Sequence, residues 1–192
     1  MTAETTTLRV LAIPEVRVCC LSCEAEGHRR GTWVPLDEAD DVITDQVHRG
    51  RVVTLTRDVA LHTDPDALQV LETRNLPVTG PLTADQVTAW QAVYETIGEE
   101  RWPALLAWVD AGVWVEDGDG LPSTAAFEER YAGTWPDFEE YARSWAEEAG
   151  MMTGWSETAV TFFDWGRWAR DARNYYTVVD APHSGVYVFR DL

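Results

Sequence analysis

The first sixty residues alternate short apolar runs with turns, a pattern typical of β-structure. Between those runs, LDEADDVITDQVH (36–48) predicts a short helix whose first turn Asp37 could cap. The runs that predict strands are VRVCCLSC (16–23), GTWV (31–34) and RVVTLT (51–56). We therefore expect a β-rich N-terminal domain over residues 1–62.

Beyond residue 62 the apolar positions follow helical spacing. Residues 63–81 contain several prolines and glycines that break regular structure and mark a boundary. Thr83 and Gln86 then form a capping-box pattern ahead of apolar positions spaced for a helix, and a second helix is predicted over 103–110. An acidic, turn-rich stretch follows. The pattern predicts a helical, acidic middle domain over residues 63–120.

The last seventy residues combine apolar helical stripes with two β-segments. Phe127 and Tyr131 lie one helical turn apart, which predicts a helix through both. Phe138, Tyr141 and Trp145 likewise recur about one helical turn apart, and acids occupy many of the remaining positions. YYTVV (175–179) and VYVFR (186–190) flank a PHSG turn and predict a hairpin. These segments predict a C-terminal α+β domain over residues 121–192, and hence an α+β chain of three small domains.

The charge of the chain excludes several classes of protein. Its 192 residues contain 33 acids and 15 cations, all of them arginine, for a formal net charge of −18. We expect no direct binding to nucleic acid, because phosphate contacts need a cationic surface. The missing lysine excludes P-loop NTPases, Schiff-base lysine enzymes and ordinary kinases. Ten tryptophans and 45% hydrophobic residues argue for a folded core despite the charge.

No group of residues has the spacing of a familiar catalytic or metal centre. Cys20 and Cys23 could form half of a zinc site, but zinc needs four ligands, and His28 is the only further candidate close in sequence. We interpret the cysteines as small apolar strand residues. Asp/Glu pairs arise by chance in so acidic a chain. We therefore expect no catalytic residue, no metal, no cofactor and no enzymatic activity.

Sequence signals for membranes and secretion are also missing. No run approaches the roughly 18 apolar residues of a membrane span, and the N-terminus lacks the features of a secretory signal. Three clustered cysteines fit reduced thiols. We expect a cytoplasmic protein with no membrane partner.

The acids concentrate in one part of the chain, which leaves two interpretations open. Residues 58–164 hold 21 acids and four arginines. These acids could simply keep the surface solvated. Alternatively, because like charges one helical turn apart repel each other, a sequence that repeats them without lysine can serve to imitate a polyanion. A dimer would carry twice −18, or −36, which duplex DNA reaches over roughly 60 Å of its axis.

Three segments in this order resemble the ArdA antirestriction family of bacterial mobile elements. CLSCEAEGHRRGTWVPLDEADD (20–41) contains the pattern Gly-x3-Gly-x-Trp at Gly27, Gly31 and Trp33, followed by acidic residues. AFEERYAGTWPDFEEYARSWAEEAG (126–150) is similar to the family's acidic helices. FFDWGRWARDARNYYTVVDAPHSGVYVFR (162–190) is similar to its final Phe-Asp-aromatic, Ala-Arg-Asp and Gly-Val-Tyr-Val-Phe runs.

The resemblance implies a shape, a partner and a mechanism. ArdA proteins are elongated homodimers of three small domains, and the C-terminal α+β domain carries the dimer contact. They mimic bent B-form DNA and bind the DNA-recognition and methyltransferase core of type I restriction-modification enzymes. They thereby protect incoming mobile DNA, without being enzymes and without a cofactor.

On this interpretation, exposed carboxylates stand in for the phosphates of DNA. Arg130 and Arg143, inside the acidic helices, are expected to form local ion pairs. Each exposed charge removed should cost about 1 kcal/mol of binding or less. The predicted phosphate-mimicking residues are Glu99, Glu100, Asp110, Glu116, Asp117, Asp119, Glu128, Glu129, Asp137, Glu139, Glu140, Glu147 and Glu148.

A dimer contact is predicted at Val186 and Val188, because an aromatic edge strand invites pairing with a second copy. An internal hairpin strand is the alternative for this segment. Two other functions stay open. One is an acidic adaptor that binds another basic DNA-binding protein, which competition with duplex DNA would separate from a mimic. The other is a small hydrolase with an unrecognised carboxylate site.

Overall fold

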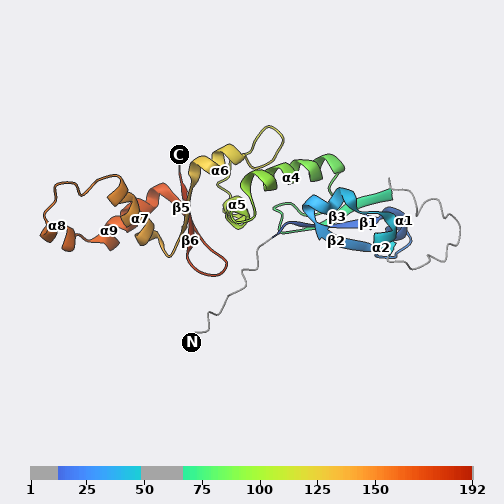
Figure 1. Cartoon of the computed structure of the whole chain (residues 1–192), viewed down its shortest axis with the longest axis horizontal. Coiled ribbons are helices and arrows are strands. Elements are labelled where there is room, and N and C mark those ends of the chain that lie inside the picture. Colours follow the sequence, from blue (N-terminus) through green and yellow to red (C-terminus); the bar gives the residue numbers. More distant parts are fainter. Residues whose placement is uncertain (1–12, 49–66, 192) are drawn as a thin grey trace, which may run out of the picture. The chain divides into compact units, whose positions relative to one another are not determined.

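Two three-stranded antiparallel sheets organise the chain, one in each of the two units into which it divides, residues 1–102 and 103–192 (Figure 1). This computed structural model describes residues 13–48 and 67–191. The mixture of small sheets and several helices agrees with the predicted α and β content. The division into three domains stays a prediction. Within the described ranges, no helix has the length and apolar character that a membrane crossing requires.

The sheet of the first unit has the strand order β2-β1-β3. It consists of β1 (Glu15–Cys20), β2 (Gly31–Pro35) and β3 (Leu68–Arg74). The strand predicted at 31–34 is confirmed, whereas the one predicted at 16–23 ends at Cys20, where the chain turns into α1 (Leu21–Ala25). β3 lies inside the stretch where a break in regular structure was expected. The strand predicted at 51–56 falls outside the described residues.

Two glycines shape the connection from α1 into β2. Gly27 has a φ of 79°, which side chains with a Cβ rarely adopt. Gly31 is the cross-strand partner of Cys19, and a Cβ added there would lie 2.6 Å from Cys19 Sγ. The Gly-x3-Gly pattern therefore combines a turn requirement with a close approach between strands.

The helix predicted over 36–48 is two shorter ones. A 3₁₀ helix, η1 (Leu36–Asp41), is followed by α2 (Thr44–His48). Asp37 does not cap it, because Pro35 precedes the helix and no side chain accepts from its first turn.

The helix predicted after Thr83 is confirmed as α4 (Ala84–Ile97). Thr83 and Gln86 bond reciprocally through side chain and backbone, so the capping box is present in full. Trp90 and Ile97 on this helix are buried in the first unit. Gly98 follows with a φ of 79° and ends the helix as expected.

The second unit places helices around a sheet of order β4-β6-β5. The helix predicted over 103–110 is confirmed as α5 (Trp102–Asp110), which begins one residue earlier. The rest of the unit comprises α6 (Thr124–Arg130), β4 (Tyr131–Trp135), α7 (Phe138–Glu148), α8 (Glu157–Thr161), α9 (Trp165–Ala172), η3 (Arg173–Tyr175), β5 (Tyr176–Asp180) and β6 (Val186–Arg190).

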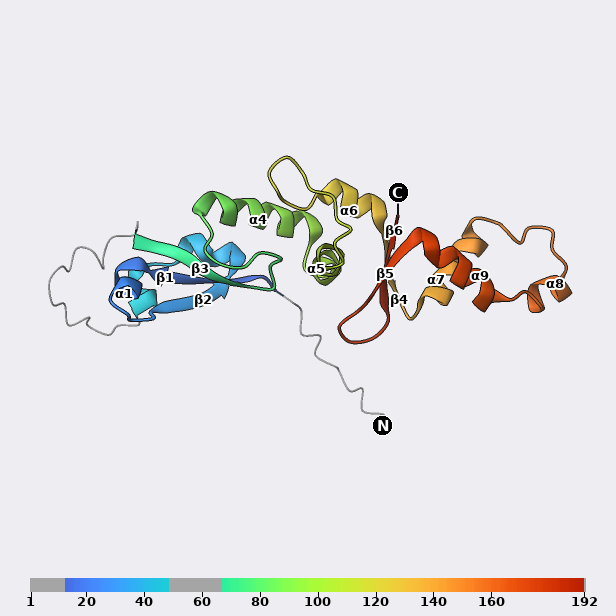
Figure 2. The same ribbon diagram turned by 180° about the vertical axis from the view of Figure 1, so that it is seen from behind.

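The helices α7 and α9 pack together against this sheet, side by side in both views (Figures 1 and 2). Their shared core contains Phe138, Tyr141, Ala169 and Val188. The predicted apolar stripe of α7 is thus confirmed, except that Trp145 is 39% exposed and stacks on Trp168. Burial of these aromatic side chains stabilises the unit.

Two predictions for the second unit are wrong. Tyr131 does not continue the helix that carries Phe127, because it begins β4 and pairs with Phe189 of β6. The predicted hairpin of β5 and β6 is confirmed. However, β6 is the central strand of the sheet and not an edge strand, since β4 and β5 pair with its two sides. The edge-strand reason for a dimer contact at Val186 and Val188 therefore fails, and Val188 is fully buried within its own chain.

Candidate acidic binding surface and a buried cysteine–histidine cluster

Helix α7 shows how the sequence separates apolar and acidic positions. Asp137 begins the helix, and its carboxylate accepts a hydrogen bond from the backbone N–H of Glu140 at 2.9 Å. Phe138, Tyr141 and Ala142 turn inward and are buried. The core contact fixes the rotation of the helix, so the remaining positions, largely acidic, face solvent.

The glutamates of α7 fall into two groups. Glu139 accepts from Arg143 at 3.3 Å, one turn away, in the local ion pair that was predicted. Glu140 and Glu147 are exposed, and they lie two turns apart, roughly 10 Å along the axis. Glu148 is exposed beside Glu147. The helix therefore presents several carboxylates to solvent and neutralises one.

Helix α6 repeats this arrangement on a shorter scale. Ser123 caps it by accepting from the backbone N–H of Ala126. Phe127 is fully buried and contacts Trp108, with ring centroids 5.7 Å apart. The two residues that follow, Glu128 and Glu129, are exposed. A buried aromatic anchor thus holds a pair of carboxylates at the surface.

The acidic stretch between α5 and α6 is a folded turn. Asp117 Oδ1 accepts from the backbone N–H groups of Asp119 and Leu121, at 3.0 and 3.1 Å. Glu116 forms a β-bridge with Pro122 across the turn. The carboxylate of Asp117 is therefore committed to the turn, whereas Glu116 and Asp119 have exposed side chains.

Exposure and charge together distinguish this set of acids. Of the thirteen predicted phosphate-mimicking residues, all but Glu139 are exposed. They are all the acids between residues 99 and 148, a range that contains three arginines. Even complete pairing with those arginines would leave ten carboxylates uncompensated. Eleven of the thirteen lie in the second unit.

The two arginines inside the acidic helices behave differently. Arg143 pairs with Glu139, and its guanidinium lies 5.1 Å from the centroid of the Trp165 ring. Arg130 has no ion pair within the described part of the chain, so the prediction of a local pair is wrong for this residue. Among the described residues, neither helix gains enough positive charge to change the sign of its surface.

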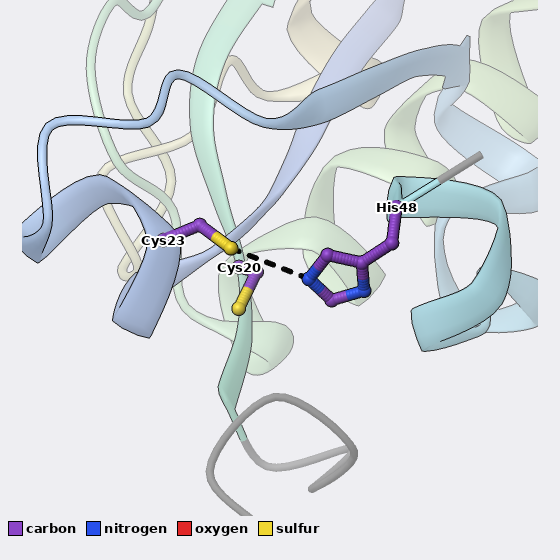
Figure 3. Close-up of side chains that lie close together, drawn as sticks. All are labelled: Cys20, Cys23 and His48. Carbon is purple, nitrogen blue, oxygen red and sulfur yellow. Dashed lines mark hydrogen bonds between the residues drawn. The ribbon is translucent and has the colours of Figure 1, made fainter. Parts of the chain in front are cut away.

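A second group of chemically active side chains lies in the first unit (Figure 3). Cys20 ends β1, Cys23 lies in α1, and His48 is the last residue of α2. All three are buried, and their Sγ and ring nitrogen atoms lie within 4.8 Å of one another. His28, the histidine suggested by sequence proximity, is not a member of this group among the described residues.

Burial controls the protonation of these thiols. It is the main cause that raises the pKa of Cys23 to about 11, and a hydrogen bond with Cys20 adds to it. Burial likewise raises the pKa of Cys19, on the neighbouring strand position, to about 11. Nearby Arg17 and Arg30 lower the two pKa values only in part, so both thiols stay protonated at neutral pH.

Sequence reasoning missed His48 because 25 residues separate it from Cys23. The sequence offers one signal that His48 is buried, namely its position at the end of an amphipathic segment that would pack against a sheet. The carboxylates, by contrast, were identifiable from sequence because local helical spacing determines where they point.

Comparison with models of protein families identifies a family for this chain. The family model described as "Antirestriction protein (ArdA)" matches residues 16–186, from β1 to the first residue of β6, and this range contains all thirteen acids of residues 99–148. No curated protein matches the chain.

Proposed function

Because the chain belongs to the ArdA family of antirestriction proteins, we propose that it inhibits type I restriction-modification enzymes by mimicking B-form DNA. Membership confirms the resemblance found in three segments of the sequence. It implies an antirestriction function and an interaction with restriction enzymes. ArdA is a family of antirestriction proteins and is not a known enzyme family. The proposal adds the class of target, the mode of binding and the residues that carry it.

The observation that carries the proposal is the exposed acidity of residues 99–148. Twelve of its thirteen acids are exposed, and three arginines accompany them. An enzyme that binds DNA must present a cationic surface to phosphates. A protein surface rich in exposed carboxylates complements the same cations, and the complementarity steers the two proteins together.

Not every acid in this range has the same role on this proposal. Asp117 and Asp137 accept backbone hydrogen bonds, and Glu139 pairs with Arg143. These three stabilise the local structure that presents the others. Glu140, Glu147 and the remaining exposed carboxylates are the groups proposed to contact the target in place of phosphates.

The proposed target surface is the methyltransferase core, which recognises DNA in a type I enzyme. A second copy of the chain would double the number of carboxylates available to it. Such a homodimer stays a prediction. If strands of the C-terminal sheet form it, β4 and β5 are the strands at the edges of that sheet, not β6.

Competition with DNA tests the proposal. A purified type I methyltransferase is loaded with a fluorescent duplex that carries its recognition site, and the protein is titrated in. We expect the duplex to be displaced, and cleavage of unmethylated DNA by the complete enzyme to stop over the same concentrations. A stable complex that contains methyltransferase, duplex and protein together would instead support an adaptor and contradict mimicry.

A further inference from the structure

The cysteine–histidine cluster of the first unit has the composition of a metal site. Cys20, Cys23 and His48 supply two sulfurs and one ring nitrogen, all buried and within 4.8 Å of one another. We propose that these three residues bind a zinc ion that fastens α1 and α2 to the sheet of the first unit. This proposal replaces the expectation from sequence that no metal is bound, and it is independent of DNA mimicry.

The distance between the sulfur of Cys23 and the ring nitrogen of His48 fits a shared zinc ion. Zinc bonds of about 2.3 Å to sulfur and 2.0 Å to nitrogen, at a tetrahedral angle, separate the two donor atoms by roughly 3.5 Å. Cys23 Sγ and His48 Nε2 are 3.4 Å apart. In Figure 3 the Cys23 sulfur points at the imidazole ring, with Cys20 beside both.

The imidazole of His48 is already oriented as a ligand. Its Nδ1 lies 2.6 Å from the backbone carbonyl oxygen of Thr44, and an Nδ1–H donates to that oxygen. This hydrogen bond selects the tautomer whose Nε2 carries the lone pair, and Nε2 is the atom that faces Cys23. Histidines that bind metal commonly make such a bond with their second nitrogen.

The charges balance in the buried site. When zinc binds, Cys20 and Cys23 each release a proton to solvent, and the two thiolates cancel the double positive charge while His48 stays neutral. The bound cluster therefore adds no net charge to the core, which avoids the cost of burying one. Thiolate and imidazole donors favour zinc over magnesium or calcium, and a water or other outside donor completes the tetrahedron.

A zinc ion at this site would stabilise helices that are too short to be stable by themselves. Helices α1 and α2 contain five residues each, far below the length at which a helix is stable by itself. Both pack against β1, and the three proposed ligands come from β1, α1 and α2. A shared metal joins the end of β1 and the adjoining α1 to α2, whose His48 lies 25 residues after Cys23, as structural zinc does in other small domains.

Metal content of the full-length chain tests the proposal. The protein is purified in reductant, incubated with Zn²⁺, passed over a desalting column and measured by inductively coupled plasma mass spectrometry. We expect the wild-type chain to retain a single zinc ion. Cys20→Ala, Cys23→Ala and His48→Gln should weaken zinc binding by more than the roughly 10- to 100-fold that loss of an outer-shell partner costs.

Cys19→Ala is the matched control, because Cys19 is a buried thiol that faces Gly31 and does not belong to the cluster. It should retain zinc like the wild type. Equal loss of zinc in Cys19→Ala and Cys20→Ala would overturn the assignment, as would a wild-type chain that retains no zinc. A Cys20–Cys23 disulfide that persists in reductant and excludes zinc would overturn it too.

Cobalt and a chelator test the wild-type chain itself, so the proposal does not depend on variants that fold. Co²⁺ should produce thiolate-to-metal charge-transfer absorption together with the strong visible bands of tetrahedral cobalt. A chelator should lower the Tm of the wild type by several degrees and leave the Tm of Cys20→Ala unchanged. No charge-transfer band, or a wild-type Tm indifferent to the chelator, would contradict a structural zinc site.

Discussion

The first sheet and the acidic helices of the second unit differ in how their acids and arginines are balanced. Cross-strand register sets Glu15 opposite Arg74 and Arg17 opposite Glu72, and both pairs are ion pairs. Between residues 99 and 148, the range that contains these helices and the turns between them, acids outnumber arginines by more than four to one.

The contrast is informative because both regions belong to one acidic chain. If the acids served only to keep the protein dissolved, cations would be interspersed with them everywhere, as they are in the sheet. Their scarcity between residues 99 and 148, with three arginines to thirteen acids, indicates that this region accepts the self-repulsion of like charges. A partner with the opposite charge removes that repulsion on binding, which is the physical basis of the proposed mimicry.

The largest expected effect comes from removing negative charges between residues 99 and 148 while the first sheet is left unchanged. We expect Asp119→Asn combined with Glu129→Gln, Glu140→Gln, Glu147→Gln and Glu148→Gln to weaken binding to the type I methyltransferase. At about 0.5 kcal/mol per exposed charge, five changes give roughly 2.5 kcal/mol, or 50- to 100-fold. Titration calorimetry measures the change.

A matched variant removes five exposed acids from the first unit. It changes the net charge equally and should leave most of the affinity intact. If this control weakens binding as much as the variant with five changes between residues 119 and 148 does, the total charge of the protein, and not the position of the charges, governs recognition. The residues neutralised in this control are Asp37, Glu38, Asp40, Asp41 and Asp45.

The arginines of the two regions should differ in their effect on stability. Arg17→Gln leaves Glu24 and Glu72 without their common partner, and the Arg17 side chain is only 12% exposed. We expect the free energy of unfolding to fall by about 1–3 kcal/mol in urea denaturation, with inhibition of restriction unchanged.

Arg143→Gln breaks a half-exposed pair in α7 and should cost under about 0.5 kcal/mol. Equal losses for the two variants would show that the ion pairs of the sheet and of the helix are equivalent in stability. The comparison between balanced and unbalanced regions would then lose its energetic basis.

A smaller effect separates structural acids from recognition acids within the helical region. Asp137→Ala removes the cap of α7 and should destabilise the protein by about 1 kcal/mol. Asp137→Asn removes the same charge but keeps an oxygen that accepts from Glu140 N–H, so its Tm should stay near that of the wild type. Thermal denaturation that shows both variants equally destabilised would assign the stabilisation to charge and not to capping.

How far the sequence predicts the structure depends on whether an interaction is local. The α4 helix and its capping box follow from Thr83 and Gln86, three positions apart. Tyr131 follows Phe127 at helical spacing, yet it becomes part of a strand because β6, nearly sixty residues later, pairs with it. Long-range pairing overrides local spacing there.

The same distinction applies to the functional residues. The exposed carboxylates of α7 could be placed from sequence, because the buried stripe of a helix determines the opposite face. The cysteine–histidine cluster could not, because it forms only when α2 folds back beside β1. Nothing in the spacing of Cys20 and Cys23 indicates which histidine will join them.

The salt dependence of binding tests the central claim most directly. The protein is titrated against a type I methyltransferase at about 50 and 200 mM salt, a range over which contacts to several phosphates weaken by orders of magnitude. If the carboxylates of residues 99–148 act as phosphates, the Kd should rise at least about tenfold across this range, as it does for the duplex. A Kd that stays constant while DNA binding weakens would contradict the account.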